Sequence, residues 1–129
     1  MAQNEMADKF KTLAGEASSG QLIIEYAAAT QCANLCDAYI ADLTDLSNRT
    51  RQMVFVGSFG DLESSKALGK KFVDLAEGGE GTGSYLDAAT KHIEILTQMA
   101  DMYRKAGAAY QNCDEATQLA IKQQTNKLD

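Results

Sequence analysis

The chain has 129 residues, of which 45% are apolar and 7% aromatic, with no proline and a formal net charge of -6. The absence of proline and the small number of aromatic residues favour long helices over a β-sheet in one soluble domain. The acidic balance argues against nucleic acid or an anionic membrane as the main partner, because both are bound through clustered Lys and Arg. No apolar run approaches the roughly 20 residues of a membrane-spanning helix, so we expect no membrane insertion.

The first twenty residues contain a short amphipathic fragment, with Met6, Phe10 and Leu13 at steps of four and three. Gly15 and a polar stretch over 18–20 follow. We interpret residues 1–20 as a flexible N-terminal arm or as a short helix that docks on the rest of the chain.

The strongest helical signal runs from Gln21 to about Val54. Apolar and small residues keep a heptad spacing there, which predicts one stripe along a long helix. The members of this heptad are Ala29, Cys32, Cys36, Tyr39, Leu43, Leu46, Thr50 and Met53. A stripe of this length needs an equally long element to cover it.

An aromatic and glycine motif interrupts the helical pattern at residues 55–60, with Phe55, Gly57, Phe59 and Gly60 as its members. The two glycines permit a sharp reversal in which the rings close the end of a helix pair. A shorter amphipathic helix to about residue 76 and a glycine-rich break over 77–83 follow.

The last long helix begins with Ser84 and Asp87, which have capping-box spacing. One stripe follows it at alternating steps of four and three: Ala89, Ile93, Leu96, Ala100, Tyr103, Gly107 and Tyr110. Asp114 is the next member, so we expect the helix to run through Asp114 and its packed face to end there. Residues 115–129 are predicted to be a polar C-terminal tail, for which helix formation on binding is one alternative.

These elements predict an all-α fold in which residues 21–114 form an antiparallel hairpin of two long helices, with a short additional helix after the turn. The apolar surface exceeds what three helices can hide, so we expect pairing into a four-helix-type bundle, as a homodimer or a heterodimer. The predicted partner-facing stripe consists of Leu22, Cys36, Tyr39, Leu43, Leu46, Ile93, Leu96, Met99 and Tyr103.

The three cysteines and the single histidine do not predict a chemical site. Cys32 and Cys36 fall on the apolar stripe, and we interpret them as small buried side chains, although a disulfide between either of them and Cys113 stays open. His92 is the only histidine and no Cys-x-x-Cys spacing occurs, so we expect no zinc site. No acid-base or nucleophile arrangement is evident, and we expect a non-enzyme without a cofactor or metal.

Two long helices joined by an aromatic-glycine reversal, with Tyr-x-x-x-Asp at the end, resemble the small WxG-type helical hairpins exported by type VII (ESX) secretion in actinobacteria. The resemblance covers about residues 22–114 and is strongest to a WxG-like branch, through the turn at 58–62 and the segment 102–110. The chain has no tryptophan; Phe55-Val56-Gly57 keeps the Trp-x-Gly spacing with a smaller ring, and Phe59-Gly60 is the other candidate.

The resemblance implies a protein made in the cytosol that pairs with a partner hairpin, such as the N-terminal helical domain of an effector, and is secreted folded without a cleavable N-terminal signal. It also implies that the secretion ATPase reads Tyr110 and Asp114 as the export signal. Only Tyr110 among the five tyrosines has an acidic residue four positions later. The plainer interpretation is that Tyr110 is the last core aromatic and Asp114 a solvated acid. The alternative functions are a cytosolic escort that is not exported and a self-associating structural bundle.

Overall fold

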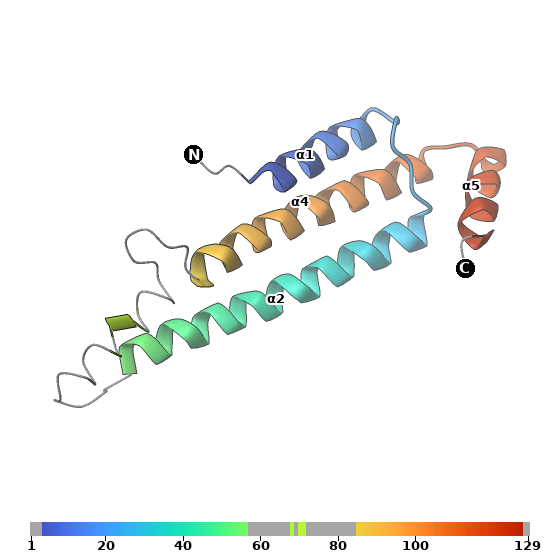
Figure 1. Ribbon diagram of the computed structural model, residues 1–129. Coiled ribbons are helices and arrows are strands. Elements are labelled where there is room, and N and C mark those ends of the chain that lie inside the picture. Colours follow the sequence, from blue (N-terminus) through green and yellow to red (C-terminus); the bar gives the residue numbers. More distant parts are fainter. Residues whose placement is uncertain (1–3, 57–67, 69, 72–84, 128–129) are drawn as a thin grey trace. The chain divides into compact units, whose positions relative to one another are not determined.

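The computed structural model describes residues 4–56, 68, 70–71 and 85–127, and the regular secondary structure in these residues is entirely helical. The helices are α1 (Glu5–Ser18), α2 (Tyr26–Val56), α4 (Tyr85–Gln111) and α5 (Glu115–Lys127), as Figure 1 shows. The all-α prediction is thus confirmed for the described residues. The chain divides into two compact units, Met1–Ile40 with Glu94–Asp129, and Ala41–Ile93.

Helix α1 occupies most of residues 1–20, for which the sequence predicts either a flexible arm or a short docked helix. Gly20, at φ +83°, ends it with a Schellman motif. The Gly20 N–H donates to Ala17 O at 3.1 Å, and the Gln21 N–H donates to Glu16 O at 2.8 Å. Three alanines of α1 are buried, namely Ala7, Ala14 and Ala17, and the end of the helix lies beside the last turns of α4 (Figure 1).

Helix α2 begins at Tyr26, so the predicted start at Gln21 is wrong. Glu25 precedes the helix, and its Oε2 accepts a hydrogen bond from the Ala28 N–H at 2.8 Å, which satisfies one of the unpaired donors at the helix start. Residues 21–24 instead cross from α1 to α2, and the Ile24 N–H donates to Ala106 O of α4 at 3.3 Å. Leu22 therefore lies in a connection rather than on the helical stripe.

The core of the first unit is built from small residues that let two helix segments approach closely. Ala33, Cys36 and Ala100 form a buried cluster, and Leu96, Met99 and Tyr103 pack against it. At Gly107 an added Cβ would lie 3.0 Å from the Ala29 Cβ, so this crossing has no room for a larger residue. The exposed Arg104 pairs with Asp37.

These contacts also give the direction of the two segments within this unit. Gly107 meets Ala29, and Arg104 meets Asp37, so residue numbers fall along α4 as they rise along α2. The parts of α2 and α4 that belong to the first unit are therefore antiparallel.

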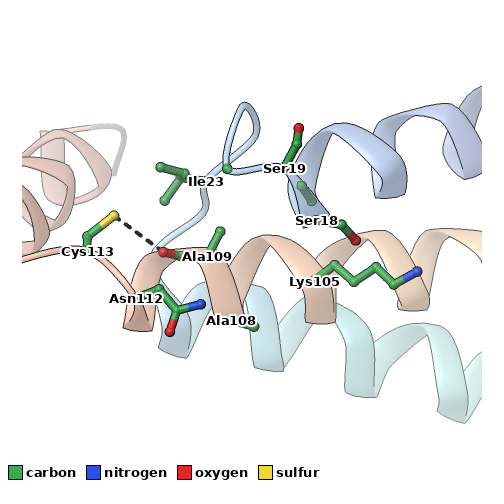
Figure 2. A pocket seen from close by; sticks show the side chains of 10 residues that line it. Ser18, Ser19, Ile23, Lys105, Ala108, Ala109, Asn112 and Cys113 are labelled. Carbon is green, nitrogen blue, oxygen red and sulfur yellow. Dashed lines mark hydrogen bonds between the residues drawn. The ribbon is translucent and has the colours of Figure 1, made fainter.

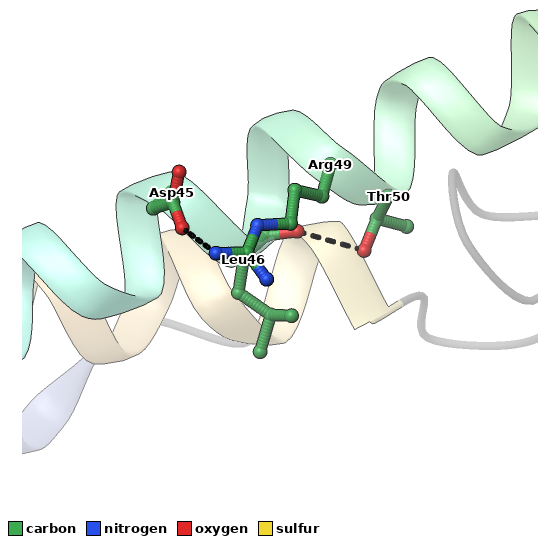
Figure 3. A network of polar contacts seen from close by, with 4 residues as sticks. All are labelled: Asp45, Leu46, Arg49 and Thr50. Atoms are coloured by element: carbon green, nitrogen blue, oxygen red, sulfur yellow. Dashed lines mark hydrogen bonds and ion pairs between the residues drawn. The ribbon is translucent and has the colours of Figure 1, made fainter.

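The second unit, Ala41–Ile93, contains the last part of α2 and the start of α4. Leu86 and Ala89 are buried there, as is Ser47, whose hydroxyl has no hydrogen-bond partner among the described residues. On the exposed side of α2, Asp45 and Arg49 form an i,i+4 ion pair at 2.7 Å (Figure 3). Such a surface pair contributes little to stability.

Most of the predicted reversal lies outside the described residues. Phe55 belongs to α2, whereas Gly57, Phe59, Gly60 and the capping residue Ser84 are not described, and neither is the glycine-rich break. Leu68, Lys70 and Lys71, which fall within the predicted short helix, are helical.

Candidate functional site

The junction between α4 and α5, defined here as Tyr110–Gln118, brings the candidate signal residues into a specific arrangement. Helix α4 ends at Gln111, so the prediction that it runs through Asp114 is wrong. The Cys113 N–H donates to Tyr110 O at 3.0 Å, an i to i+3 bond that closes the last turn. The next helix begins at Glu115.

Asp114 is the N-cap of α5. Its Oδ1 accepts a hydrogen bond from the Thr117 N–H at 2.7 Å, and the Gln118 N–H donates to its carbonyl oxygen at 2.9 Å. The backbone N–H of Thr117 lowers the pKa of the Asp114 carboxyl, and a hydrogen bond with the Thr117 side chain lowers it further. Asp114 is exposed, so this carboxylate is accessible.

Tyr110 lies in the last turn of α4 and is only 9% exposed. Its hydroxyl donates a hydrogen bond to the backbone oxygen of Gln118 at 3.1 Å. The phenol is therefore engaged by the following helix of the same chain, and Tyr110 and Asp114 do not share one helix face as their spacing predicts.

Gln118 completes the junction from the other side. Its side-chain amide lies within donating distance of three carbonyl oxygens, those of Tyr110 (3.0 Å), Gln111 (3.3 Å) and Cys113 (3.1 Å). The last carbonyls of a helix have no partner within it, and the two N–H donors of the Gln118 amide can bond two of these three oxygens at a time. Sequence reasoning missed this residue, although Asp114 followed by Glu115 carries the composition of a helix start, which could have located the break.

A pocket of about 470 Å³ lies beside the junction, between the end of α1 and the end of α4 (Figure 2). It is lined by Ser18, Ser19, Ile23 and Asn112 among others, and the Cys113 thiol donates to Ala109 O at 3.3 Å at its edge. No group of three or more His, Cys, Asp or Glu side chains that could hold a metal ion occurs among the described residues.

All three cysteines, which lie in described segments, are free thiols. Burial is the main reason that the pKa of the Cys36 thiol is raised, so this thiol stays protonated at neutral pH. Burial likewise raises the pKa of Tyr103, and the neighbouring Cys32 raises it further. Cys113, unlike the buried Cys36, is half-buried beyond the end of α4, where it lines the pocket between α1 and α4 together with Ile23.

The structure separates the predicted partner-facing stripe into inward and outward residues. In the first unit, Cys36 is buried in the core, Leu96, Met99 and Tyr103 are half-buried against it, and Leu22 is half-buried in the connection. Tyr39 is exposed. In the second unit, Leu43 and Ile93 are half-buried and Leu46 is exposed.

An exposed apolar face remains on the first part of α2. Leu35 is 64% and Tyr39 58% exposed, and they are four residues apart on one face of the helix. Leu35 also lines a shallow groove with Tyr26, Ala27, Thr30, Gln31 and Asn34.

Comparison with known proteins finds no matching family model, no matching curated protein and no matching solved structure. None of the described helices combines the length and apolar character required to cross a bilayer. The described residues thus form helices only, with an exposed apolar face on α2 and a two-helix junction around Tyr110.

Proposed function

We propose that this chain is a partner-binding helical protein of the type VII secretion class, a substrate or co-substrate rather than an enzyme. In this proposal the two long helices form a hairpin that pairs with a partner hairpin or with the N-terminal domain of an effector. The observation that carries it is the antiparallel packing of α2 on α4 in the first unit, which ends at the junction holding Tyr110 and Asp114.

The exposed face of α2 supports the partner-binding part of the proposal. Large apolar side chains such as Leu35 and Tyr39 gain free energy when a partner removes them from water. Aromatic side chains such as Tyr39 are common anchors of protein interfaces. A partner helix laid along α2 would cover both.

The α4–α5 junction is the proposed site of recognition by the secretion ATPase. Asp114 is exposed and available for contact. The Tyr110 side chain is only 9% exposed and its hydroxyl is bonded to the backbone oxygen of Gln118 in α5, so a receptor that contacts the phenol has to displace this bond.

The export signal is tested by replacing Tyr110. We expect Tyr110→Ala to abolish secretion while the partner still binds, because the proposed partner face is on α2 and the change is at the end of α4. Secretion is measured by immunoblotting culture filtrate against cell lysate in a host with a type VII system, and partner binding by co-purification.

A control variant removes a tyrosine outside the proposed signal. Tyr85→Ala changes an exposed tyrosine in the first turn of α4, where no acidic residue follows four positions later. It should leave secretion unchanged. Retained partner binding by Tyr110→Ala shows that this variant is still folded. Undiminished secretion of Tyr110→Ala would contradict the export signal, and a wild-type chain found with its partner only in the lysate would favour the escort function.

A further inference from the structure

We infer that α5 is a latch that covers Tyr110 and that Gln118 holds it closed. The role of this latch in export rests on the proposed function, whereas the latch itself is a property of the isolated chain. Its closed state is the arrangement described at the α4–α5 junction.

The latch is held by a reciprocal pair of contacts between Tyr110 and Gln118. The Tyr110 hydroxyl donates to the Gln118 backbone oxygen, and the Gln118 amide donates to the carbonyls at the end of α4. The bond from the Tyr110 hydroxyl and the bond from the Gln118 amide to Tyr110 O are partly buried, whereas the bond to Gln111 O is exposed, and all three are lost together if α5 moves away. Gln118 is thus the single side chain on which the closed state depends most.

The rest of α5 is weakly held. Among its residues 115–125, only Gln118, Ile121 and Thr125 are even half-buried, and they lie along one face at steps of three and four. Leu119 is 58% exposed. A helix of 13 residues is near the lower limit of independent stability in water, so α5 depends on this narrow contact.

Opening the latch changes the relation between Tyr110 and Asp114. In the closed state Asp114 caps α5 and belongs to a different helix from Tyr110. Once α5 is released, residues 112–114 can continue α4 by one turn, which brings Tyr110 and Asp114 to i,i+4 positions on one face. The paired signal then exists only in the open state, and a receptor that binds the pair shifts the chain toward it.

The latch is tested by placing a negative charge against the three carbonyls. Gln118→Glu removes the amide donor and repels these oxygens, so α5 should detach more often. The readout is nitration of Tyr110 in the purified full-length chain, measured by peptide mass spectrometry as a ratio to Tyr103. We expect this ratio to rise roughly fivefold or more. Loss of one net hydrogen bond costs about 1 kcal/mol, and about 1.4 kcal/mol corresponds to a tenfold change in an equilibrium constant.

Gln123→Glu is the matched control, because it makes the same change at an exposed position on the same helix. It should leave the ratio at the wild-type value. Gln118→Leu removes the donor without adding charge and should give a smaller rise in the same direction. An unchanged ratio in both Gln118 variants would overturn the latch.

The secretion assay distinguishes the latch from the proposed function. If Gln118→Glu exposes Tyr110 and raises the secreted fraction, the result supports both the latch and the proposed export function. If it exposes Tyr110 while no variant, including the wild type, is secreted, the latch stands and the export function fails.

Discussion

Asp114 shows how one side chain can redirect the backbone at the end of a packed helix. Asp favours N-cap positions because its carboxylate accepts hydrogen bonds from free N–H groups near the helix start, and this competes with continuing the preceding helix. The Thr117 N–H provides that donor here. The spacing of apolar residues does not show whether the backbone continues α4 or begins a new helix at Asp114.

The cap makes the stability of α5 depend on pH. The pKa of Asp114 is lowered in the folded chain from its ordinary value of 3.8, so the stabilisation is present above that value and is lost as the pH falls through the folded pKa. Asp114→Asn keeps an oxygen acceptor that does not titrate in this range. We expect the variant to match the wild type near pH 7 and to keep more helix than the wild type as the pH falls below 3.8 and through the folded pKa.

Far-UV circular dichroism as a function of pH measures this difference. Asp45→Asn is a suitable control, since it changes an exposed carboxylate of the second unit. Identical acid transitions in the wild type and Asp114→Asn would contradict the capping role.

At the scale of the elements, α2 and α4 approach closely in the first unit through small residues, with Leu96, Met99 and Tyr103 packed beside them. Ala29, Ala33 and Ala106 are essentially inaccessible to solvent, and Gly107 allows the close approach at the crossing. Close helix contact of this kind limits which substitutions the interface accepts, because cores at full packing density tolerate added volume poorly.

Two glycines give a direct test of this packing. Gly15→Ala in α1 should raise the free energy of unfolding by up to about 1 kcal/mol, because its new Cβ meets nothing within 4 Å and alanine favours the helix. Gly107→Ala gains the same helix propensity but places its Cβ 3.0 Å from the Ala29 Cβ, so its gain should be cancelled or reversed. Urea unfolding monitored by circular dichroism measures both, and an equal gain at the two positions would show that the crossing is looser than the structure indicates.

At the scale of the whole molecule, the first part of α2 presents apolar side chains that no described residue covers. Leu35 and Tyr39 are well over half exposed on one helix face. Single exposed apolar residues are common on protein surfaces and need no explanation. Neighbouring ones on one helix face are typical of a surface that binds a partner.

Replacing these side chains should weaken association. Full burial of a large apolar side chain is worth about 1.5–3 kcal/mol, so we expect Leu35→Ser and Tyr39→Ser each to lower affinity for a partner hairpin by about tenfold or more. Arg49→Ala, an exposed change on the same helix, should have little effect. Sedimentation of the purified chain, alone and with the candidate partner, measures this; a stable homodimer that ignores the partner would favour the self-associating bundle.

The helical class and the main helical stretches could be predicted from the sequence, as could the burial of Cys36. Helix boundaries could not. The apolar run at 22–24 predicts a start of α2 five residues early, whereas Glu25 caps the helix and Ile24 is bonded to the backbone of α4. Residues 115–129 have few apolar positions to give a period, so the sequence predicts a tail that is helical at most on binding, whereas the structure forms α5 within the chain itself.

Periodicity by itself determined that this chain is helical, since every third or fourth residue along its long stretches is apolar and only a helix places those residues on one face. Only the tertiary structure decided the state of Tyr110. Its hydroxyl is bonded to the backbone of Gln118, eight residues away across the break between α4 and α5, and the Gln118 side-chain amide is bonded to the Tyr110 carbonyl in return. Such a contact is specified by the relative position of two helices, which the spacing of residues within either one does not encode.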